Sequence, residues 1–371
     1  MKTKMSVAGG VTQKKHREKI TDTKLLLTIT ICIFILMYAL SIVIWGGGFA
    51  RPQRLFDILN NNASLFVVAC GLTIVMITGG IDISVGGITA LVVMTCAIQM
   101  DNGGNVYSGI AIALAIGLGF GLVQGYLIAY MDIQPFIITL AGMFFARGMT
   151  TVVSVNPHKA ENAGFLALKD AKIEIPWLGY EAGNGNIIPA RIEYGVVVAI
   201  LVILVIFVLL KWSRIGRNFF AVGGSPQSAL MLGINVKRTK FVAYLISGIL
   251  SGIGGFVFLM HTGAGNASNA SGAEMNAIAS AIIGGTLLSG GVGSVVGTFF
   301  GVLTLSLIKT IVVASGLQEP YWQSITTGAM LCFFILLQSV ILSYRANGGL
   351  KFRMPSWLSR NSHHSAPKER Q

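Results

Sequence analysis

Ten long apolar runs follow one another along this chain, and they constrain its fold more than any other feature. They extend over about 25–45, 64–80, 82–100, 108–130, 135–153, 193–210, 241–262, 277–290, 292–314 and 323–343. A helix of about 20 residues crosses the roughly 30 Å hydrocarbon core of a bilayer, and helices satisfy their own backbone groups there. The sequence therefore predicts an all-α, polytopic membrane protein of about ten transmembrane helices, with short or interrupted helices at 64–80 and 277–290.

Composition agrees with a chain surrounded by membrane lipid. Only 11% of its residues are charged and 53% are hydrophobic, whereas a soluble domain has about 25% charged residues. The net charge of +13 comes from Lys and Arg residues that flank the apolar runs, which is a topology signal. We therefore expect no nucleic-acid partner. The four cysteines lie inside apolar runs without CxxC spacing, so no disulfide or metal site is predicted.

The positive charges predict the orientation of the chain. Most of the 27 Lys and Arg residues lie in 1–24, 211–240 and 344–371, and 211–240 contains no acid. Because cytoplasmic segments carry the excess of Lys and Arg, both termini are expected in the cytoplasm. The predicted organisation is a basic N-terminal segment 1–24, a transmembrane domain 25–343 and a basic tail 344–371, expected to be disordered. The run 25–45 is read as an uncleaved first helix because no A-x-A cleavage site follows it.

One stretch outside the membrane is long enough to do more than connect two helices. Residues 154–192 contain three prolines and the polar run EAGNGN. The sequence leaves two interpretations open, a simple connector or a docking surface for an extracytoplasmic partner.

A glycine-rich corner with a carboxylate interrupts the apolar sequence at 76–90, MITGGIDISVGGITA. Gly79 and Gly80 permit conformations that end a helix, and Asp82 is placed as the N-cap of the next helix. Ser84 and Gly86 are small enough for close helix approach. Either Asp82 only caps a helix, or the corner lines a translocation path, as interrupted helices in transporters commonly do.

Two other residues invite a functional or a structural interpretation. Arg147 is a cation inside a span, which hints at function because such charges are costly in lipid. Glu274 precedes the run 277–290, where it could cap that helix or contact an extracytoplasmic binding protein, and we expect the cap. Asp82 is the one clear acid at membrane depth, which disfavours a proton-coupled carrier.

The inside segment 211–240 predicts a short cytoplasmic helix. Ser225 suits the N-cap, Pro226 suits the first helical position, and Gly233 is placed to end the helix. It is either a capped connector or a docking element for another subunit. The chain has no GxxxxGK[ST], HExxH or GxSxG motif, so an enzymatic role is not predicted, and no cofactor is expected on this chain. Energy for transport would come from another subunit or from an ion gradient.

Two long motifs resemble bacterial ABC importer permeases of the ribose, galactose and xylose type. They are GLTIVMITGGIDISVGGITALVVM at 71–94 and GAEMNAIASAIIGGTLLSGGVGSVVGTFFGVL at 272–303, and Ala146–Gly148 also fits. The sequence GGTLLSGGVG and the pair Tyr321–Trp322 resemble the corresponding segments of the second permease of galactofuranose-type systems. The resemblance covers about 25–343.

The resemblance implies a monosaccharide permease in the bacterial plasma (inner) membrane. Its implied partners are a cytoplasmic ABC ATPase that holds ATP and magnesium, a second permease copy or close paralogue, and an extracytoplasmic sugar-binding protein. The resemblance also implies residues that couple the permease to the ATPase, namely Gly224, Ser225, Pro226, Ala229 and Gly233. The residues that it places along a translocation path are Gly79, Gly80, Asp82, Ser84, Gly86 and Arg147. The alternatives are a branched-chain amino-acid or nucleoside ABC permease and, from another class, an ion-coupled secondary carrier.

Overall fold

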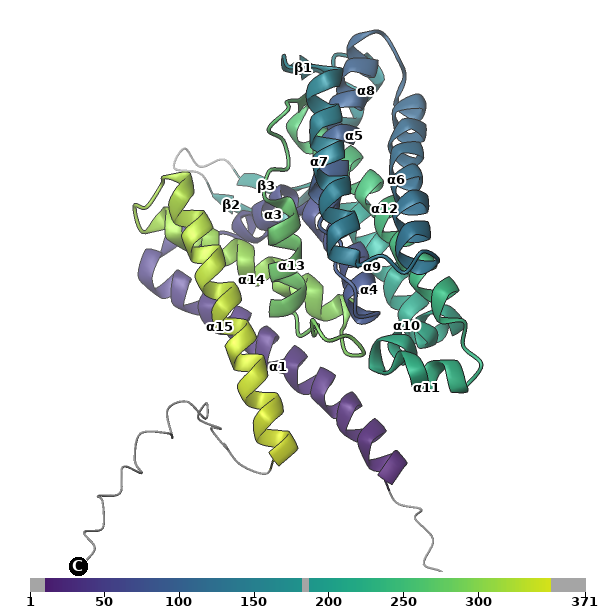
Figure 1. The fold of residues 1–371 in the computed structure, drawn as a ribbon. Helices are drawn as coiled ribbons and strands as arrows, with labels where there is room; N and C mark the ends of the chain where they lie inside the picture. The colour runs from purple at the N-terminus through teal and green to yellow at the C-terminus, as the bar shows by residue number, and fades with distance from the viewer. Residues whose placement is uncertain (1–10, 182–186, 348–371) are drawn as a thin grey trace, which may run out of the picture. The chain divides into compact units, whose positions relative to one another are not determined.

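The computed structural model describes residues 11–181 and 187–347, which are mostly helical (Figure 1). Of the predicted terminal segments 1–24 and 344–371, residues 11–24 and 344–347 are helical, and the remainder, 1–10 and 348–371, lies outside the described residues. The chain divides into two compact units, Met1–Leu331 and Cys332–Gln371. The first unit holds the features described below, and the described part of the second is helical.

Each apolar run of the sequence falls on a helix. Within the described residues, seven helices are long and apolar enough to cross a membrane. They are α1 (Val11–Trp45, apolar from Leu25), α6 (Val106–Ala129), α7 (Pro135–Val153), α9 (Tyr194–Trp212), α12 (Val236–Thr262), α14 (Val295–Ala314) and α15 (Pro320–Asn347). The runs at 64–80, 82–100 and 277–290 give shorter helices, α4 (Ala63–Ile77), α5 (Val85–Asp101) and α13 (Ala273–Ile283). Helix α3 (Pro52–Asn61) precedes α4, and the chain bends by 57° between them. These findings confirm a polytopic membrane protein.

The short helices α4 and α5 form the interior, and α12 packs against both of them and against α6. Nearly every residue of α4 from Phe66 onward is buried. The contact between α12 and α6 is made backbone to backbone, because a Cβ at Gly248 would meet the main chain of Gly117 and Gly121. Small residues at this spacing allow membrane helices to approach closely.

The stretch 154–192 adds strands to an otherwise helical fold. After α8 (Ala163–Asp170), strand β2 (Lys172–Glu181) pairs antiparallel with β3 (Ile187–Glu193), with a register shift between Ile175 and Tyr180. A second pair joins β1 (His158–Lys159) to β4 (Ala264–Gly265). The prediction of an all-α fold therefore holds for the apolar runs and is wrong for this stretch.

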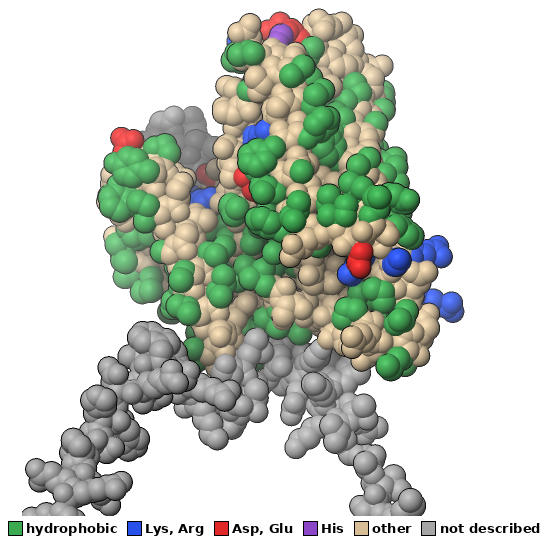
Figure 2. Space-filling view, in the orientation of Figure 1, with side chains coloured by type: hydrophobic (Ala, Val, Ile, Leu, Met, Phe, Trp, Pro, Cys, Tyr) green, Lys and Arg blue, Asp and Glu red, His purple; other side chains and the backbone are tan. Residues whose placement is uncertain are grey.

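Three shorter helices complete the fold. Helix α2 (Gly47–Ala50) follows α1, while α10 (Arg214–Gly224) and α11 (Pro226–Met231) follow α9. Figure 1 shows α10 and α11 together at the end of the bundle opposite β1 and α8. Lys and Arg side chains gather around α10 in the space-filling view (Figure 2).

Candidate functional site

The first corner reverses the chain between α4 and α5, as the sequence predicts. Gly79 has φ +84°, in the left-handed region that glycine adopts without strain. The Gly79 amide donates to the Met76 carbonyl at 2.9 Å, and the Gly80 amide donates to the Val75 carbonyl at 3.1 Å. This pair of bonds is the pattern of a Schellman helix end. The chain then continues to α5 without regular structure through Ile83.

Asp82 is 1% exposed and has a hydrogen-bond donor on each oxygen. Its Oδ1 accepts from the Ser84 amide at 3.0 Å and the Ser84 hydroxyl at 2.6 Å, and its Oδ2 accepts from the Ser247 hydroxyl at 2.7 Å. The predicted N-cap role is wrong in detail, because Ser84 occupies the N-cap position of α5. Asp82 lies two residues earlier, where it orders the turn into α5 and ties that turn to α12.

Polar side chains from two spans extend this network. The Ser84 hydroxyl lies 2.9 Å from the carboxamide of Gln124 on α6. The atom at this distance is Gln124 Oε1, and Gln124 Nε2 has no partner among the described residues. Because the Ser84 hydroxyl proton is donated to Asp82, the opposite orientation of the carboxamide, with Nε2 donating to Ser84, would satisfy both side chains. The Tyr244 hydroxyl donates to the Ile81 carbonyl at 3.2 Å. Sequence reasoning missed Gln124, Tyr244 and Ser247, because an isolated polar residue in a span gives no signal of its partner.

A second corner, at 284–294, has the same backbone reversal as the first. Gly285 has φ +88°. Its amide donates to the Ile282 carbonyl, and the Thr286 amide donates to the Ala281 carbonyl, each at 2.9 Å. The two corners are in contact, since the Gly291 amide donates to the Ile77 carbonyl at 2.8 Å. The structure thus brings two interrupted helix pairs into contact, which the sequence did not predict.

The short helix predicted within 211–240 forms. The Ser225 hydroxyl accepts the Ser228 amide at 3.2 Å, Pro226 begins α11, and Gly233 has φ +77° beyond its end. Ala229, one of the residues assigned a coupling role, is 1% exposed and packs inward. The outward side chains are those of Leu230, Met231 and Leu232, which are 66%, 88% and 77% exposed.

The end of α10 lies against both corners. A Cβ at Gly223 would overlap the Ile77 carbonyl oxygen and approach the Gly291 amide, and one at Gly291 would approach the backbone of Gly224. Beside this contact, a cavity of about 200 Å³ is lined by residues of the first corner and of α10, α11 and α12. It is lined by Thr78, Gly79, Gly80, Ile128, Pro135, Val222, Gly223, Pro226, Lys240, Tyr244 and Ser289. Gly79 and Gly80 thus share a cavity lining with Gly223 and Pro226, while Gly224 lies against Gly291 of the second corner.

Gly86 and Arg147 belong to a separate polar cluster, at the start of α13. Arg147 donates to the Asn269 carbonyl at 2.7 Å and to the Ala270 carbonyl at 2.6 Å, and its Nη2 lies 3.8 Å from Glu274 Oε2. A Cβ at Gly86 would overlap that same carboxylate oxygen. The predicted side-chain cap by Glu274 is absent, because Gly272 is the N-cap of α13 and no side chain caps it. Glu274 instead faces α5 and α7.

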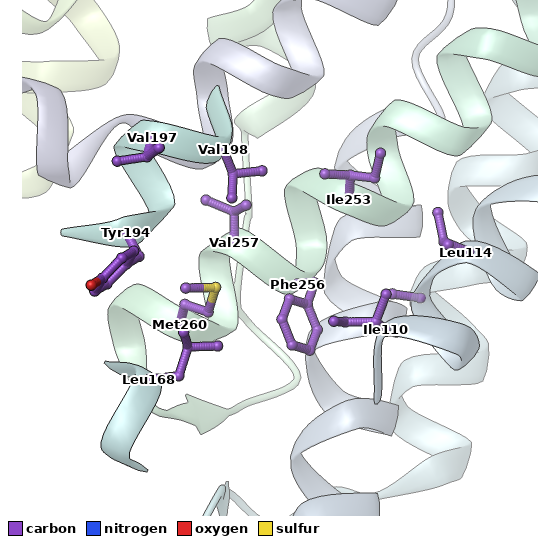
Figure 3. Close-up of a pocket in the computed structure, with 11 residues that line it drawn as sticks. Ile110, Leu114, Leu168, Tyr194, Val197, Val198, Ile253, Phe256, Val257 and Met260 are labelled. Carbon is purple, nitrogen blue, oxygen red and sulfur yellow. The ribbon is translucent and has the colours of Figure 1, made fainter. Parts of the chain in front are cut away.

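A cavity of about 270 Å³ between α6, α9 and α12 is unsuited to a hydroxylated solute (Figure 3). Ile110 and Leu114 of α6 lie on one side, Val197 and Val198 of α9 on the other, with Phe256 of α12 between them. Its lining is hydrophobic and aromatic, and such a lining offers few hydrogen bonds to replace those of water. The polar clusters at the corners and at Glu274 are therefore the better candidates for a solute path.

Comparison with known proteins shows similarity along most of the chain. Residues 54–335 match the family described as branched-chain amino acid transport system / permease component. The chain is 37% identical to the inner membrane ABC transporter permease protein YjfF of Escherichia coli (strain K12), over 84% of this chain and 91% of that protein. It is 31% identical to the fructose import permease protein FruG of Bifidobacterium longum (strain NCC 2705), over 84% and 90%.

A third relative is the ribose import permease protein RbsC of Escherichia coli (strain K12), 30% identical over 78% of this chain and 87% of that protein. No solved structure matches the chain. A family match across 54–335, together with relatives that align over more than three quarters of the chain, places the polypeptide in the branched-chain amino acid transport system / permease component family.

Proposed function

We propose that the chain is the membrane-spanning permease subunit of an ATP-driven importer that carries a monosaccharide through a bacterial inner membrane. The observation that carries this proposal is the alignment of most of the chain with relatives named for fructose and ribose import. The description of the family names branched-chain amino acids, so an amino-acid permease is the second candidate.

The proposed topology has ten membrane-embedded helices and both termini in the cytoplasm. The seven long spans and the shorter α4, α5 and α13 make up the ten. The basic segment 211–240, which contains α10 and α11, supports a cytoplasmic position for that end of the bundle. The β2–β3 hairpin then lies outside, where Trp177, which is 87% exposed, is suited to contact an extracytoplasmic sugar-binding protein.

The docking surface for a cytoplasmic ABC ATPase is assigned to Leu230, Met231 and Leu232. Three neighbouring apolar side chains exposed beside a basic loop are typical of a surface that a partner covers. Ser225, Pro226 and Gly233 set the bounds of α11 and so position this surface. ATP and magnesium would be held by the ATPase, and a second permease copy or close paralogue would complete the pathway.

Coupling is proposed to run from this surface to the two corners. Movement of α11 would displace α10, whose Gly223 and Gly224 lie against Ile77 and Gly291. Because Gly79 and Gly80 belong to the same corner as Ile77, the displacement would reach the break between α4 and α5. Asp82 and Ser84 would keep that break attached to α12.

Reconstitution in sealed vesicles tests the proposed function. The permease, its ATPase and its binding protein would be combined, and the uptake of radiolabelled fructose, ribose, galactose, leucine and adenosine measured with and without ATP. We expect ATP-dependent uptake of one sugar that survives a protonophore. Uptake of leucine or adenosine alone would contradict the sugar assignment, and accumulation driven by a proton gradient without the ATPase would contradict the transporter class.

A further inference from the structure

A polar, non-helical segment between β4 and α13 runs along α5 toward the middle of the helix bundle. Its depth can be read along α5: Gly265 packs against Met94 and Ala97, and Glu274 packs against Gly86. At 1.5 Å per residue, the α5 positions 86 and 97 are about 16 Å apart. The segment therefore reaches the middle of the bundle from the end that carries β1 and β4.

The composition of this segment suits water better than lipid. Residues 263–274 read GAGNASNASGAE, and the side chains of Asn266, Ser268 and Ser271 are exposed. Non-helical backbone at membrane depth is tolerated only where protein surrounds it or where it lines an aqueous cavity. The Ser268 hydroxyl donates to Asn266 Oδ1 at 3.2 Å. Lipid would leave the Asn266 amide nitrogen and the Ser271 hydroxyl without partners, so these exposed groups favour the aqueous cavity.

Arg147 holds the segment in its conformation. It donates to two consecutive carbonyls, those of Asn269 and Ala270. Ala270 has φ +53°, which is unusual for a residue with a side chain. The guanidinium stabilises this backbone and leaves the Glu274 carboxylate 3.8 Å away, beyond hydrogen-bonding distance.

Glu274 Oε2 is the unusual atom in this cluster. It is buried and accepts no hydrogen bond from the described residues. A buried carboxylate oxygen is stabilised when a donor reaches it. A sugar hydroxyl is such a donor, and the exposed Ser271 lies three residues before Glu274 in the same segment.

We propose that residues 266–274 line the solute pathway and that Glu274 accepts hydrogen bonds from hydroxyl groups of the transported solute, with Arg147 as a positioning residue. The assignment to a hydroxylated solute rests on the proposed function. The assignment of an aqueous path rests only on the depth, the polarity and the exposure of the segment.

Thiol labelling tests the aqueous path without any solute. Ser268→Cys and Ser271→Cys would be made in a chain whose Cys32, Cys70, Cys96 and Cys332 are replaced by Ala, and the full transporter treated in sealed vesicles with a charged methanethiosulfonate from outside. Leu118→Cys, midway along α6, is the matched control. Because charged reagents do not enter hydrocarbon, we expect at least about tenfold faster labelling of one of the two segment cysteines. Rates equal to that of the control at both positions would overturn the path.

Uptake kinetics test the contact with Glu274. Glu274→Gln keeps the size of the side chain but removes its charge, and we expect the KM for the transported sugar to rise by about tenfold. Glu193→Gln is the control, because Glu193 pairs with His261 at the end of another helix, and its KM should be unchanged. An unchanged KM and maximal rate for Glu274→Gln would overturn the contact.

The two assays separate the two proposals. If no sugar is transported but Ser271→Cys is labelled, the proposed substrate class is wrong and the path stands. If the native chain transports a sugar and neither segment cysteine is labelled, the path is wrong and the proposed function stands.

Discussion

Asp82 is stable among apolar helices because each of its oxygens has a donor. The Ser84 amide and hydroxyl and the Ser247 hydroxyl supply three hydrogen bonds to a side chain that is 1% exposed. Buried polar networks of this kind specify one arrangement when every member is satisfied. Asp82 therefore has a structural role that is independent of its proposed position near the solute path.

Replacing Asp82 with Ala should destabilise the protein and abolish uptake. The Ser84 amide and the two serine hydroxyls would lose their acceptor, and each stranded donor costs about 1–3 kcal/mol. We expect a lower thermal midpoint for the purified permease in detergent and no uptake by the reconstituted transporter.

The matched control is Asp170→Ala, since Asp170 is an exposed carboxylate at the end of α8. Its midpoint should equal that of the native chain. A stable Asp82→Ala protein with full uptake would contradict both roles of Asp82.

The sequence was sufficient to locate Asp82, but it did not predict the depth of Glu274 or the outward face of α11. Asp82 stands out as an acid inside an apolar run, so the sequence located it. Glu274 appeared to precede a span, and only the packing of 263–274 along α5 places it at membrane depth. Ala229 and Met231 lie in a helix of six residues, which is too short for periodicity to distinguish its inward face from its outward face.

At the scale of the elements, the junction of α10 with the two corners should not tolerate a side chain. Gly223→Ala would force the Ile77 carbonyl and α10 apart, since the added Cβ overlaps that oxygen. We expect ATP hydrolysis by the assembled transporter to continue while uptake falls, measured in the same vesicles. Gly328→Ala, where a Cβ has open space, is the control. Coupled uptake at the native rate would show that the contact does not transmit motion.

The contact between α6 and α12 makes a separate prediction about stability. Gly248→Val would insert a side chain against the main chain of Gly117 and Gly121, and overpacking costs about 1–3 kcal/mol. The thermal midpoint should fall. Gly119→Val on α6, where nothing lies within 4 Å of the new Cβ, should leave it almost unchanged. Equal midpoints for the two variants would contradict the close approach.

Most elements could be predicted because their signals are local. An apolar run of 20 residues, or a serine followed by a proline and later a glycine, specifies a helix within its own sequence. The hydrogen bond between Gly291 and Ile77 joins residues far apart in the chain, and nothing in either motif specifies it. The β2–β3 hairpin was missed because three prolines and a polar run concealed its short alternating pattern.

At the scale of the whole molecule, the exposed apolar surface of α11 predicts assembly. Met231→Asp would place a charge where Leu230, Met231 and Leu232 are proposed to meet the ATPase, and burying an unpaired charge is unfavourable. We expect the variant to reach the membrane but to lose the ATPase on co-purification. Leu166→Asp on α8, at the opposite end of the bundle, should retain it. Retention by both variants would remove the docking assignment.

The glycine junction also determines how stiff the link between the loop and the membrane interior is. Gly223, Gly291 and Ile77 meet through their main chains, so no side chain lies between them that could absorb a displacement by rotating. A small shift of α10 would therefore pass to both helix breaks at once and nearly undiminished. Such a linkage favours simultaneous, all-or-none rearrangement of the two breaks over independent movement of either one.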